Sequence, residues 1–180
     1  MASEPVPAIE IRALTASPRV REMLVSILRE VVAGDGSVGF MHPLGVEAAG
    51  SFWDASLAAA ARGERIILGA WDGEAVVGSL SLLLDCPPNQ PHRAEVAKMM
   101  TRPSHRGRGV ATALLRAAEG LAVARGKSLL VLDTAVEGGA SGLYERAGFT
   151  LAGTIPDYAL TPLGQLTGTR IYWKRIGDRA

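Results

Sequence analysis

The sequence predicts an α/β (α+β) fold in a single domain over residues 1–180. Several short stretches alternate apolar and polar residues, as strands do, and longer stretches carry apolar residues at helical spacing. A strand, a helix and a second strand follow one another between residues 93 and 133, as in a crossover between parallel strands. With 48% hydrophobic and 21% charged residues, a chain of this length can bury one core of ordinary size.

The first strand and the first helix are expected near the start of the chain. Residues 8–14 alternate apolar and polar side chains, which predicts a half-buried strand at or near an edge of the sheet. Ser17 followed by Pro18 is typical of a helix N-terminus, and apolar residues then recur at helical spacing. The helix is predicted over residues 18–33, because glycines at 34 and 36 interrupt the pattern.

A second helix and a hairpin follow. Apolar residues at helical spacing and a run of alanines predict a helix over residues 46–62. Residues 65–71 and 74–84 are predicted strands, and the Asp-Gly pair at 72–73 favours a tight turn between them.

The second half contains the predicted crossover. A proline-rich loop precedes a strand over residues 93–101, and a helix follows over residues 110–125. Residues 128–133 are the next strand, whose apolar run Leu-Leu-Val-Leu predicts burial on both faces, as in a central parallel strand. The remaining predicted elements are a short helix, 140–147, and two strands, 149–155 and 169–175, with a long loop between these strands.

The Arg- and Gly-rich turn before the helix at 110–125 is predicted to bind phosphate. Gly107 and Gly109 lack a Cβ, so successive backbone N–H groups can point at an anion. The helix N-terminus adds a partial positive charge, and Arg106 and Arg108 supply full charges. A phosphate-bearing cofactor is therefore expected at this turn.

A dinucleotide-binding turn is the alternative. The segment GRGVAT resembles G-x-G-x-x-G, and Asp133 ends the next strand, where an acid that binds ribose would lie. Thr112 stands in place of the third glycine, however, and residues 102–106 separate the strand from the first glycine. A nicotinamide-dependent oxidoreductase is therefore the less favoured hypothesis.

Two motifs resemble those of the GNAT N-acetyltransferase superfamily. Arg106-x-x-Gly109-x-Ala111 follows a strand, and the segment LYERAGF begins at Leu143. In that superfamily the first motif holds the pyrophosphate of acetyl-CoA. The resemblance implies a seven-stranded, mixed and mostly antiparallel sheet that splays between strands 4 and 5, with helices on both faces. It also implies acetyl transfer to an amine by direct attack in a ternary complex, without a covalent enzyme intermediate.

The resemblance also implies which residues bind acetyl-CoA. The pantetheine is expected to pair with the backbone of the strand at 93–101, and the pyrophosphate to rest on the turn after it. Glu137 departs from the pattern, because many members of the superfamily have an asparagine near this position. The expected cosubstrate residues are Met99, Met100, Thr101, Arg106, Gly107, Arg108, Gly109, Val110, Ala111 and Thr112.

Three side chains are expected to carry out the chemistry. Glu95 and Asp133 lie on the two strands that flank the crossover, and each is a candidate base for the amine. The alternatives are an ion pair of Glu95 with Arg93 or Lys98, and capping of the following loop by Asp133. Tyr144 stands where the superfamily places the phenol that acts as general acid for the departing thiolate. An ordinary half-buried aromatic on a helix is the alternative for this residue.

The acceptor is expected to be a small polar molecule with a primary amine. Loops carry specificity on a rigid sheet, so Phe40, Met41, Asp157 and Tyr158 are candidates for its pocket. Four segments are similar to acetyltransferases that inactivate an amino-acid toxin, which makes a toxin or an antibiotic a candidate acceptor. A catalytically silent member that senses acetyl-CoA is the alternative. The four segments are 37–41, 93–100, 129–134 and 156–174.

Charge and composition argue against other partners. The net charge of +1, from 19 basic and 18 acidic residues, does not favour nucleic acid. No segment is apolar enough to span a bilayer, and the single cysteine, Cys86, fits a reducing compartment, so the cytoplasm is expected. His42, His92 and His105 lack metal-ligand spacing, so no metal is expected. Whether the protein is a monomer or a homodimer stays open.

Overall fold

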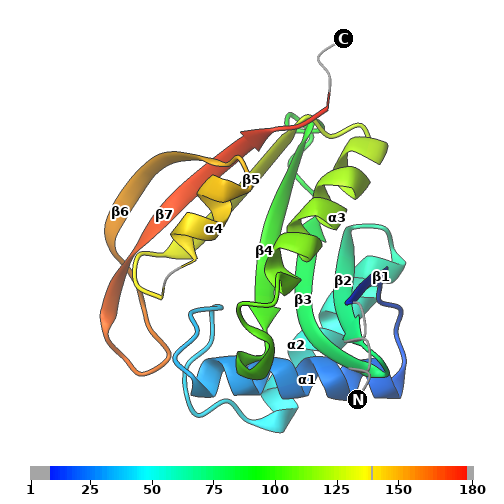
Figure 1. Ribbon diagram of the computed structural model, residues 1–180, viewed down its shortest axis with the longest axis vertical. Coiled ribbons are helices and arrows are strands. Elements are labelled where there is room, and N and C mark those ends of the chain that lie inside the picture. Colours follow the sequence, from blue (N-terminus) through cyan, green and yellow to red (C-terminus); the bar gives the residue numbers. More distant parts are fainter. Residues whose placement is uncertain (1–8, 139, 178–180) are drawn as a thin grey trace, which may run out of the picture.

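A seven-stranded sheet runs through the protein (Figure 1), in a computed structural model that describes residues 9–138 and 140–177. In chain order the elements are β1 (Glu10–Ala13), α1 (Pro18–Ala33), α2 (Val46–Ala61), β2 (Arg65–Asp72), β3 (Ala75–Leu83), β4 (Arg93–Thr101), a 3-10 turn (Pro103–His105), α3 (Val110–Ala124), β5 (Leu129–Ala135), α4 (Ser141–Arg146), β6 (Thr150–Leu160) and β7 (Leu166–Arg175).

The sheet order is β1-β2-β3-β4-β5-β7-β6, and only β4 and β5 are parallel neighbours. Helices α1 and α2 cover one face, and α3 and α4 cover the other (Figure 1). The predicted fold class and the predicted crossover through α3 are thereby confirmed. Residue 8 of the predicted first strand lies outside the described residues. Within the described residues, no helix is long and apolar enough to cross a membrane.

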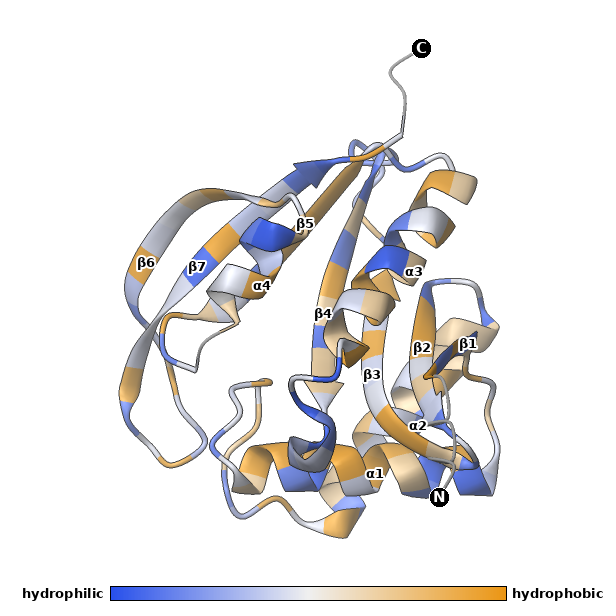
Figure 2. Cartoon of the chain, viewed as in Figure 1, coloured by the Kyte–Doolittle hydropathy of each residue, from blue (hydrophilic) through white to orange (hydrophobic). Residues whose placement is uncertain are grey.

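Hydrophobic residues pack on both faces of the sheet. Much of β2 and part of β3 are coloured as hydrophobic in Figure 2. On the α1 and α2 face, Leu24, Trp53 and Ile67 belong to one cluster of buried side chains. On the α3 face, Leu114 and Leu130 belong to another. Amphipathic helices on both sides of one sheet therefore fix the strands that carry the site.

The predicted hairpin forms, but its turn lies one residue later than expected. Asp72 is the last residue of β2 and pairs with Ala75, so the two turn residues are Gly73 and Glu74. Gly73 has a φ of 58°, a conformation that glycine adopts without steric cost. The backbone of Asp72 is thus paired within the sheet, and its side chain is not part of the hairpin turn.

The predicted long loop near the C-terminus is wrong. β6 continues to Leu160 and β7 begins at Leu166, which leaves a short hairpin connection. Pro156 interrupts the β6–β7 ladder only as a bulge, after which Ala159 pairs with Thr167. An edge strand tolerates proline because its outer backbone groups need no partner strand. The result is a longer β6–β7 hairpin.

The prediction that β5 is central is confirmed, but burial on both of its faces is not. Leu130 and Leu132 are buried in the cluster under α3, whereas Leu129 and Val131 are only half-buried. The reason is that α1 packs on β3 and β4 and α2 packs on β2. This face of β5 is therefore less covered than the face under α3.

Candidate active site

A gap opens in the sheet between β4 and β5. The two strands pair at only three positions, the last of which joins Glu95 to Val131, and they then diverge (Figure 1). The predicted splay is confirmed. Beyond Glu95 the edge of β4 that faces β5 has no partner strand over residues 96–101 within the described parts of the chain. Backbone groups in such a position require a partner, and an extended ligand can supply one.

A bulge redirects side chains in the middle of β4. Ser81 pairs with Ala97 and Ser79 pairs with Met100, so two residues of β4 lie between these pairs and only one residue of β3 does. Lys98, at the bulge, has a φ of 49°, which is unusual for a residue other than glycine. Bulges of this kind re-aim a side chain. The Nζ of Lys98 reaches the loop after α1, where it donates to the Val38 carbonyl at 2.7 Å.

A cavity of about 850 Å³ lies along this gap. Its walls come from β4, the turn before α3, the end of β5, α4, the loop after α1, and the β6–β7 hairpin. Twelve of the residues proposed from the sequence line it, whereas Phe40, Met41, Glu95, Arg108 and Asp157 do not. The twelve are Met99, Met100, Thr101, Arg106, Gly107, Gly109, Val110, Ala111, Thr112, Asp133, Tyr144 and Tyr158.

The turn before α3 offers backbone donors at one side of the cavity. Gly107 and Gly109 have φ values of 74° and 79°, which explains why glycine is needed at both positions. The first bond of the helix runs from the Ala113 N–H to the Gly109 carbonyl at 3.0 Å, so the three preceding N–H groups have no helical acceptor. Donors at a helix N-terminus favour an anion. The same turn is strongly hydrophilic in Figure 2.

Asp72, on the β2–β3 hairpin, contacts two side chains of the turn before α3. Its Oδ2 lies 3.2 Å from Nε2 of His105 and 3.4 Å from Nη2 of Arg108. Ser104 Oγ lies 2.9 Å from Nδ1 of His105 and completes the cluster. Arg108 is therefore engaged with Asp72 outside the cavity lining, and Arg106 is the arginine of the turn that lines the cavity. In the sequence Asp72 looked like a turn residue, and no pattern there indicated the contact.

Tyr144 is buried on α4, with 5% of its surface exposed, and lines the cavity. Its ring centroid lies 5.7 Å from that of Tyr172 and 6.0 Å from that of Phe149. Burial, and after it the charge of Asp133, raises the pKa of Tyr144 to about 12, although the Thr134 side chain acts in the opposite direction. The phenol is thus held protonated in a fixed position.

The two predicted carboxylates have different surroundings. Asp133 lines the cavity at the end of β5 and accepts a hydrogen bond from Thr169 Oγ1 at 3.3 Å. It does not cap α4, whose N-cap is Ala140. Glu95 does not line the cavity, and its Oε2 lies 3.2 Å from Nη1 of Arg93. The structure therefore contains the ion pair that was the alternative for Glu95, and it presents Asp133 to a ligand.

The proposed acceptor residues are only partly brought together. Neither Phe40, whose ring packs edge-on against Phe52 at 5.1 Å between centroids, nor Met41 lines the cavity. Asp157 also lies outside the lining, whereas Tyr158 is part of it. Lys98 also lines the cavity, although the sequence suggests it only as a partner of Glu95.

Two hydrogen bonds join the loop after α1 to the β6–β7 hairpin. The His42 N–H donates to the Pro162 carbonyl at 2.9 Å, and the Leu163 N–H donates to Asp35 Oδ1 at 3.1 Å. These segments are far apart in the sequence, and residues of both segments line the cavity. The contact therefore ties together two walls of the cavity. No pattern in the sequence indicates this contact, because the segment that forms the β6–β7 hairpin resembles a loop.

Comparison with known proteins agrees with this fold. The sheet is similar to the structure of yncA from Salmonella typhimurium with its cofactor acetyl-CoA, at 17% identity and a TM-score of 0.75, covering 94% of this chain and 96% of that one. It is similar to an aminoglycoside 6'-N-acetyltransferase complexed with coenzyme A, at 17% identity, a TM-score of 0.74, and coverage of 95% and 99%. A proposed phosphinothricin N-acetyltransferase is 22% identical, with a TM-score of 0.72 and coverage of 94% and 100%.

The family assignment follows from the sequence match together with this fold. The acetyltransferase (GNAT) family matches residues 36–149, which is more than half of the chain. The matched region contains the turn before α3, the gap between β4 and β5, and Tyr144. The chain belongs to the acetyltransferase (GNAT) family.

Proposed function

We propose that this GNAT acetyltransferase transfers the acetyl group of acetyl-CoA to a primary amine of a small polar, amino-acid-like molecule. One observation carries the proposal: three N–H groups at the start of α3, without helical acceptors, adjoin an unpaired strand edge in a cavity that also contains Asp133 and Tyr144. The N–H groups suit a diphosphate, the strand edge suits an extended chain of amides, and the Asp133 and Tyr144 side chains suit a reacting thioester.

The cosubstrate would be held mainly by backbone. Its diphosphate fits the N–H groups at residues 110–112, with Arg106 as the lining cation. Its pantetheine amides fit the open edge of β4 near Met99 and Thr101. This placement directs the thioester toward the end of β5, where Asp133 and Tyr144 line the cavity.

Asp133 is the proposed base for the acceptor amine. An amine attacks only when uncharged, and at pH 7 deprotonation costs about 1.4 kcal/mol for an α-amine and roughly 4 to 5 kcal/mol for a lysine-type amine. The nitrogen then bonds to the thioester carbon, its proton passes to Asp133, and the carbon–sulfur bond breaks. Glu95 lies in an ion pair outside the cavity lining, which favours Asp133 for this role.

Tyr144 is proposed to stabilise the departing thiolate. With a pKa of about 12 the phenol is protonated at neutral pH. Full transfer of its proton to a thiolate with an ordinary pKa near 8.5 would be uphill by roughly 5 kcal/mol. A hydrogen bond to the developing negative charge is therefore its main contribution. The thiolate takes a proton from water as coenzyme A leaves, and Asp133 releases the amine proton to solvent.

The proposed acceptor class rests on similarity. The four segments noted above are similar to the tabtoxin resistance protein, an acetyltransferase that inactivates an amino-acid toxin. Similar folds occur in an aminoglycoside 6'-N-acetyltransferase and in a proposed phosphinothricin N-acetyltransferase. A toxin or an antibiotic with a primary amine is therefore the favoured acceptor.

Two measurements test the proposal. Calorimetry should detect one acetyl-CoA site per chain, and thiol release should require both acetyl-CoA and an added amine from a panel of amino acids, aminoglycosides and diamines. Absence of acetyl-CoA binding would contradict the proposal. Binding without thiol release for any amine would instead favour the silent sensor, for which Glu137 in the cavity lining is the specific observation.

A further inference from the structure

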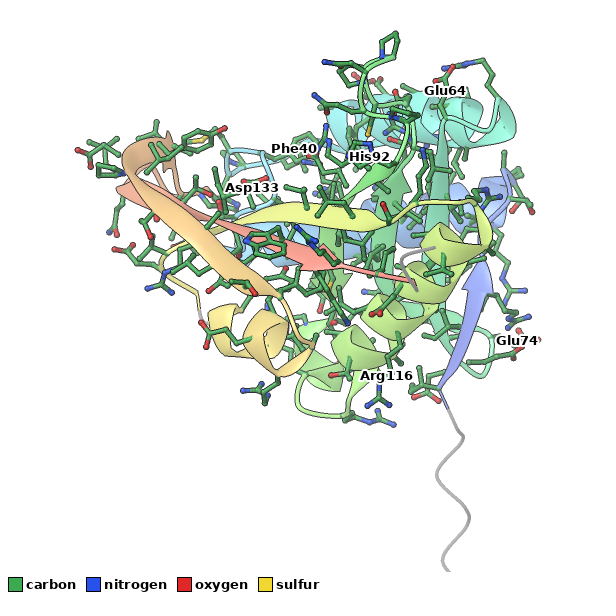
Figure 3. The ribbon with its side chains drawn as sticks, turned by 90° about the horizontal axis from the view of Figure 1, so that it is seen from above. Phe40, Glu64, Glu74, His92, Arg116 and Asp133 are labelled. Carbon is green, nitrogen blue, oxygen red and sulfur yellow. The ribbon has the colours of Figure 1, made fainter. Side chains whose placement is uncertain are left out.

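We infer that Lys98 is the anion-binding residue of the acceptor site, and that the acceptor carries a carboxylate near the amine that is acetylated. This inference rests on the proposed function. It starts from the position of the Lys98 ammonium, which the bulge in β4 turns toward the loop after α1. In Figure 3, Asp133 and Phe40 lie on the same side of the sheet, and Arg116 of α3 lies on the other.

The Lys98 ammonium is partly desolvated by its neighbours. Its Nζ lies 5.6 Å from the ring centroid of Phe40 and 5.7 Å from that of Phe52. The backbone of Gly39 also lies close to the Lys98 Nζ, since a Cβ at this position would lie 3.0 Å from it. Burial lowers the pKa of Lys98, and the charges of Asp133 and then Glu95 oppose this effect.

The ammonium has unused hydrogen-bonding capacity. It carries three N–H donors, and one of them is used by the Val38 carbonyl at 2.7 Å. In the described parts of the chain no carboxylate lies within 4.0 Å of it, so it has no ion pair. A lining ammonium with aromatic neighbours and without a counter-ion is suited to bind an anionic group of a ligand.

The cosubstrate does not supply that anion. The charged groups of acetyl-CoA are phosphates, and the proposed phosphate site is at the start of α3, next to Arg106. The remaining basic residues among the described lining side chains, His105 and Arg146, lie on the turn before α3 and on α4. Lys98 is thus the basic side chain of the described lining that comes from the interior of β4.

Lys98 and Asp133 together match a zwitterion. Both residues line the same cavity, and the charge of Asp133 opposes the lowering of the Lys98 pKa by burial. An amino acid whose carboxylate binds Lys98 would present its amino group to Asp133, the proposed base for the attacking nitrogen. Amines without an acidic group would lack the first contact.

Matched pairs of acceptors test the inference. Thiol release is measured with each L-amino acid and with its carboxamide, for the wild type, for Lys98→Met, and for the control Lys127→Met. Lys127 also donates to a backbone carbonyl, that of Pro91 at 2.8 Å, but it does not line the cavity. The wild type and Lys127→Met should favour acids over amides by roughly 10- to 100-fold in kcat/KM.

Lys98→Met should lose this preference while it retains acetyl-CoA binding. A purely structural role, in which Lys98 only holds the loop at Val38, would lower the use of acids and amides alike. The inference is overturned if the wild type uses amides as well as acids, if it accepts only amines that lack an acid, or if Lys98→Met keeps the preference.

A binding readout separates this inference from the proposed function. Thermal shift is measured with coenzyme A present and the same acid and amide pairs added. If no amine releases thiol, the proposed function fails. A shift with acids but not amides, present in the wild type and lost in Lys98→Met, still supports the anion site, whereas the absence of any such shift overturns it.

Discussion

Asp133 on β5 and Tyr144 on α4 line the same cavity, and the charge of Asp133 adds to burial in raising the pKa of Tyr144 to about 12. The pair therefore combines a charged carboxylate with a phenol that stays neutral. In the proposed reaction the first accepts a proton while the second donates a hydrogen bond, and the raised pKa of Tyr144 keeps its phenol protonated for that role.

The first prediction concerns Tyr144→Phe. Loss of a hydrogen bond to a charged thiolate costs about 1.5 to 3 kcal/mol, so kcat should fall roughly 10- to 100-fold. The affinity for acetyl-CoA, measured by calorimetry, should change by less than about two-fold, because the proposed binding contacts are made by backbone of β4 and α3. An unchanged kcat would remove Tyr144 from the mechanism.

The second prediction concerns stability at high pH. The folded-state pKa of Tyr144 is raised to about 12 from the ordinary value of 10.0, so the unfolded chain loses this proton first as the pH rises. The resulting stabilisation is complete below pH 10 and is lost between pH 10 and pH 12. It amounts to about 3 kcal/mol. Urea unfolding at a series of pH values should show a steeper alkaline loss for the wild type than for Tyr144→Phe; parallel curves would contradict the raised pKa.

The third prediction separates the two carboxylates. Asp133→Asn should lower kcat by roughly 10²- to 10⁴-fold, the usual contribution of a general base, and the loss should be smaller for acceptors with less basic amines. Glu95→Gln should have a much smaller effect on kcat, since Glu95 is paired with Arg93 outside the cavity lining. Steady-state kinetics with saturating acetyl-CoA provide the measurement. A larger loss for Glu95→Gln would reverse the assignment.

Local patterns in the sequence predicted most of the fold. Ser17 and Pro18 marked the start of α1, and the structure shows Ser17 Oγ accepting a hydrogen bond from the Val20 N–H at 3.2 Å. The bounds of β4 agree as well, because its alternation ends at an Arg-Pro step. The β6–β7 hairpin was missed, since Pro156 and the nearby glycines resemble a loop until the bulge and the pairing of Ala159 are known.

The site was less predictable than the fold. The glycines of the turn before α3 and Tyr144 belong to local motifs, so the sequence predicts their positions. Three other features depend on tertiary contacts or on backbone conformations that no local pattern specifies. They are the contacts of Asp72 with the turn before α3, the pairing of Glu95 with Arg93, and the direction of the Lys98 side chain. The sequence predicts Asp133 as a candidate base, but it does not favour Asp133 over Glu95. Only the structure shows that Asp133 lines the cavity and that Glu95 does not.

The last prediction concerns Asp72, which binds His105 and Arg108 at the turn before α3. Asp72→Ala should leave both side chains without this anchor and let the turn sample conformations in which its N–H groups no longer converge. The KM for acetyl-CoA should then rise about 5- to 20-fold, as expected for the loss of one or two partly exposed charged contacts of about 1 to 2 kcal/mol.

The value of kcat at saturating acetyl-CoA should be unchanged by Asp72→Ala, because Asp72 does not line the cavity. Glu74→Ala is the matched control. Glu74 lies on the same hairpin and pairs with Arg19 at 3.0 Å. Among the described residues its side chain makes no ion pair with the turn before α3, so its loss should leave KM at the wild-type value. An equal rise of KM in both variants would mean that the hairpin as a whole, and not the Asp72 carboxylate, positions the turn before α3.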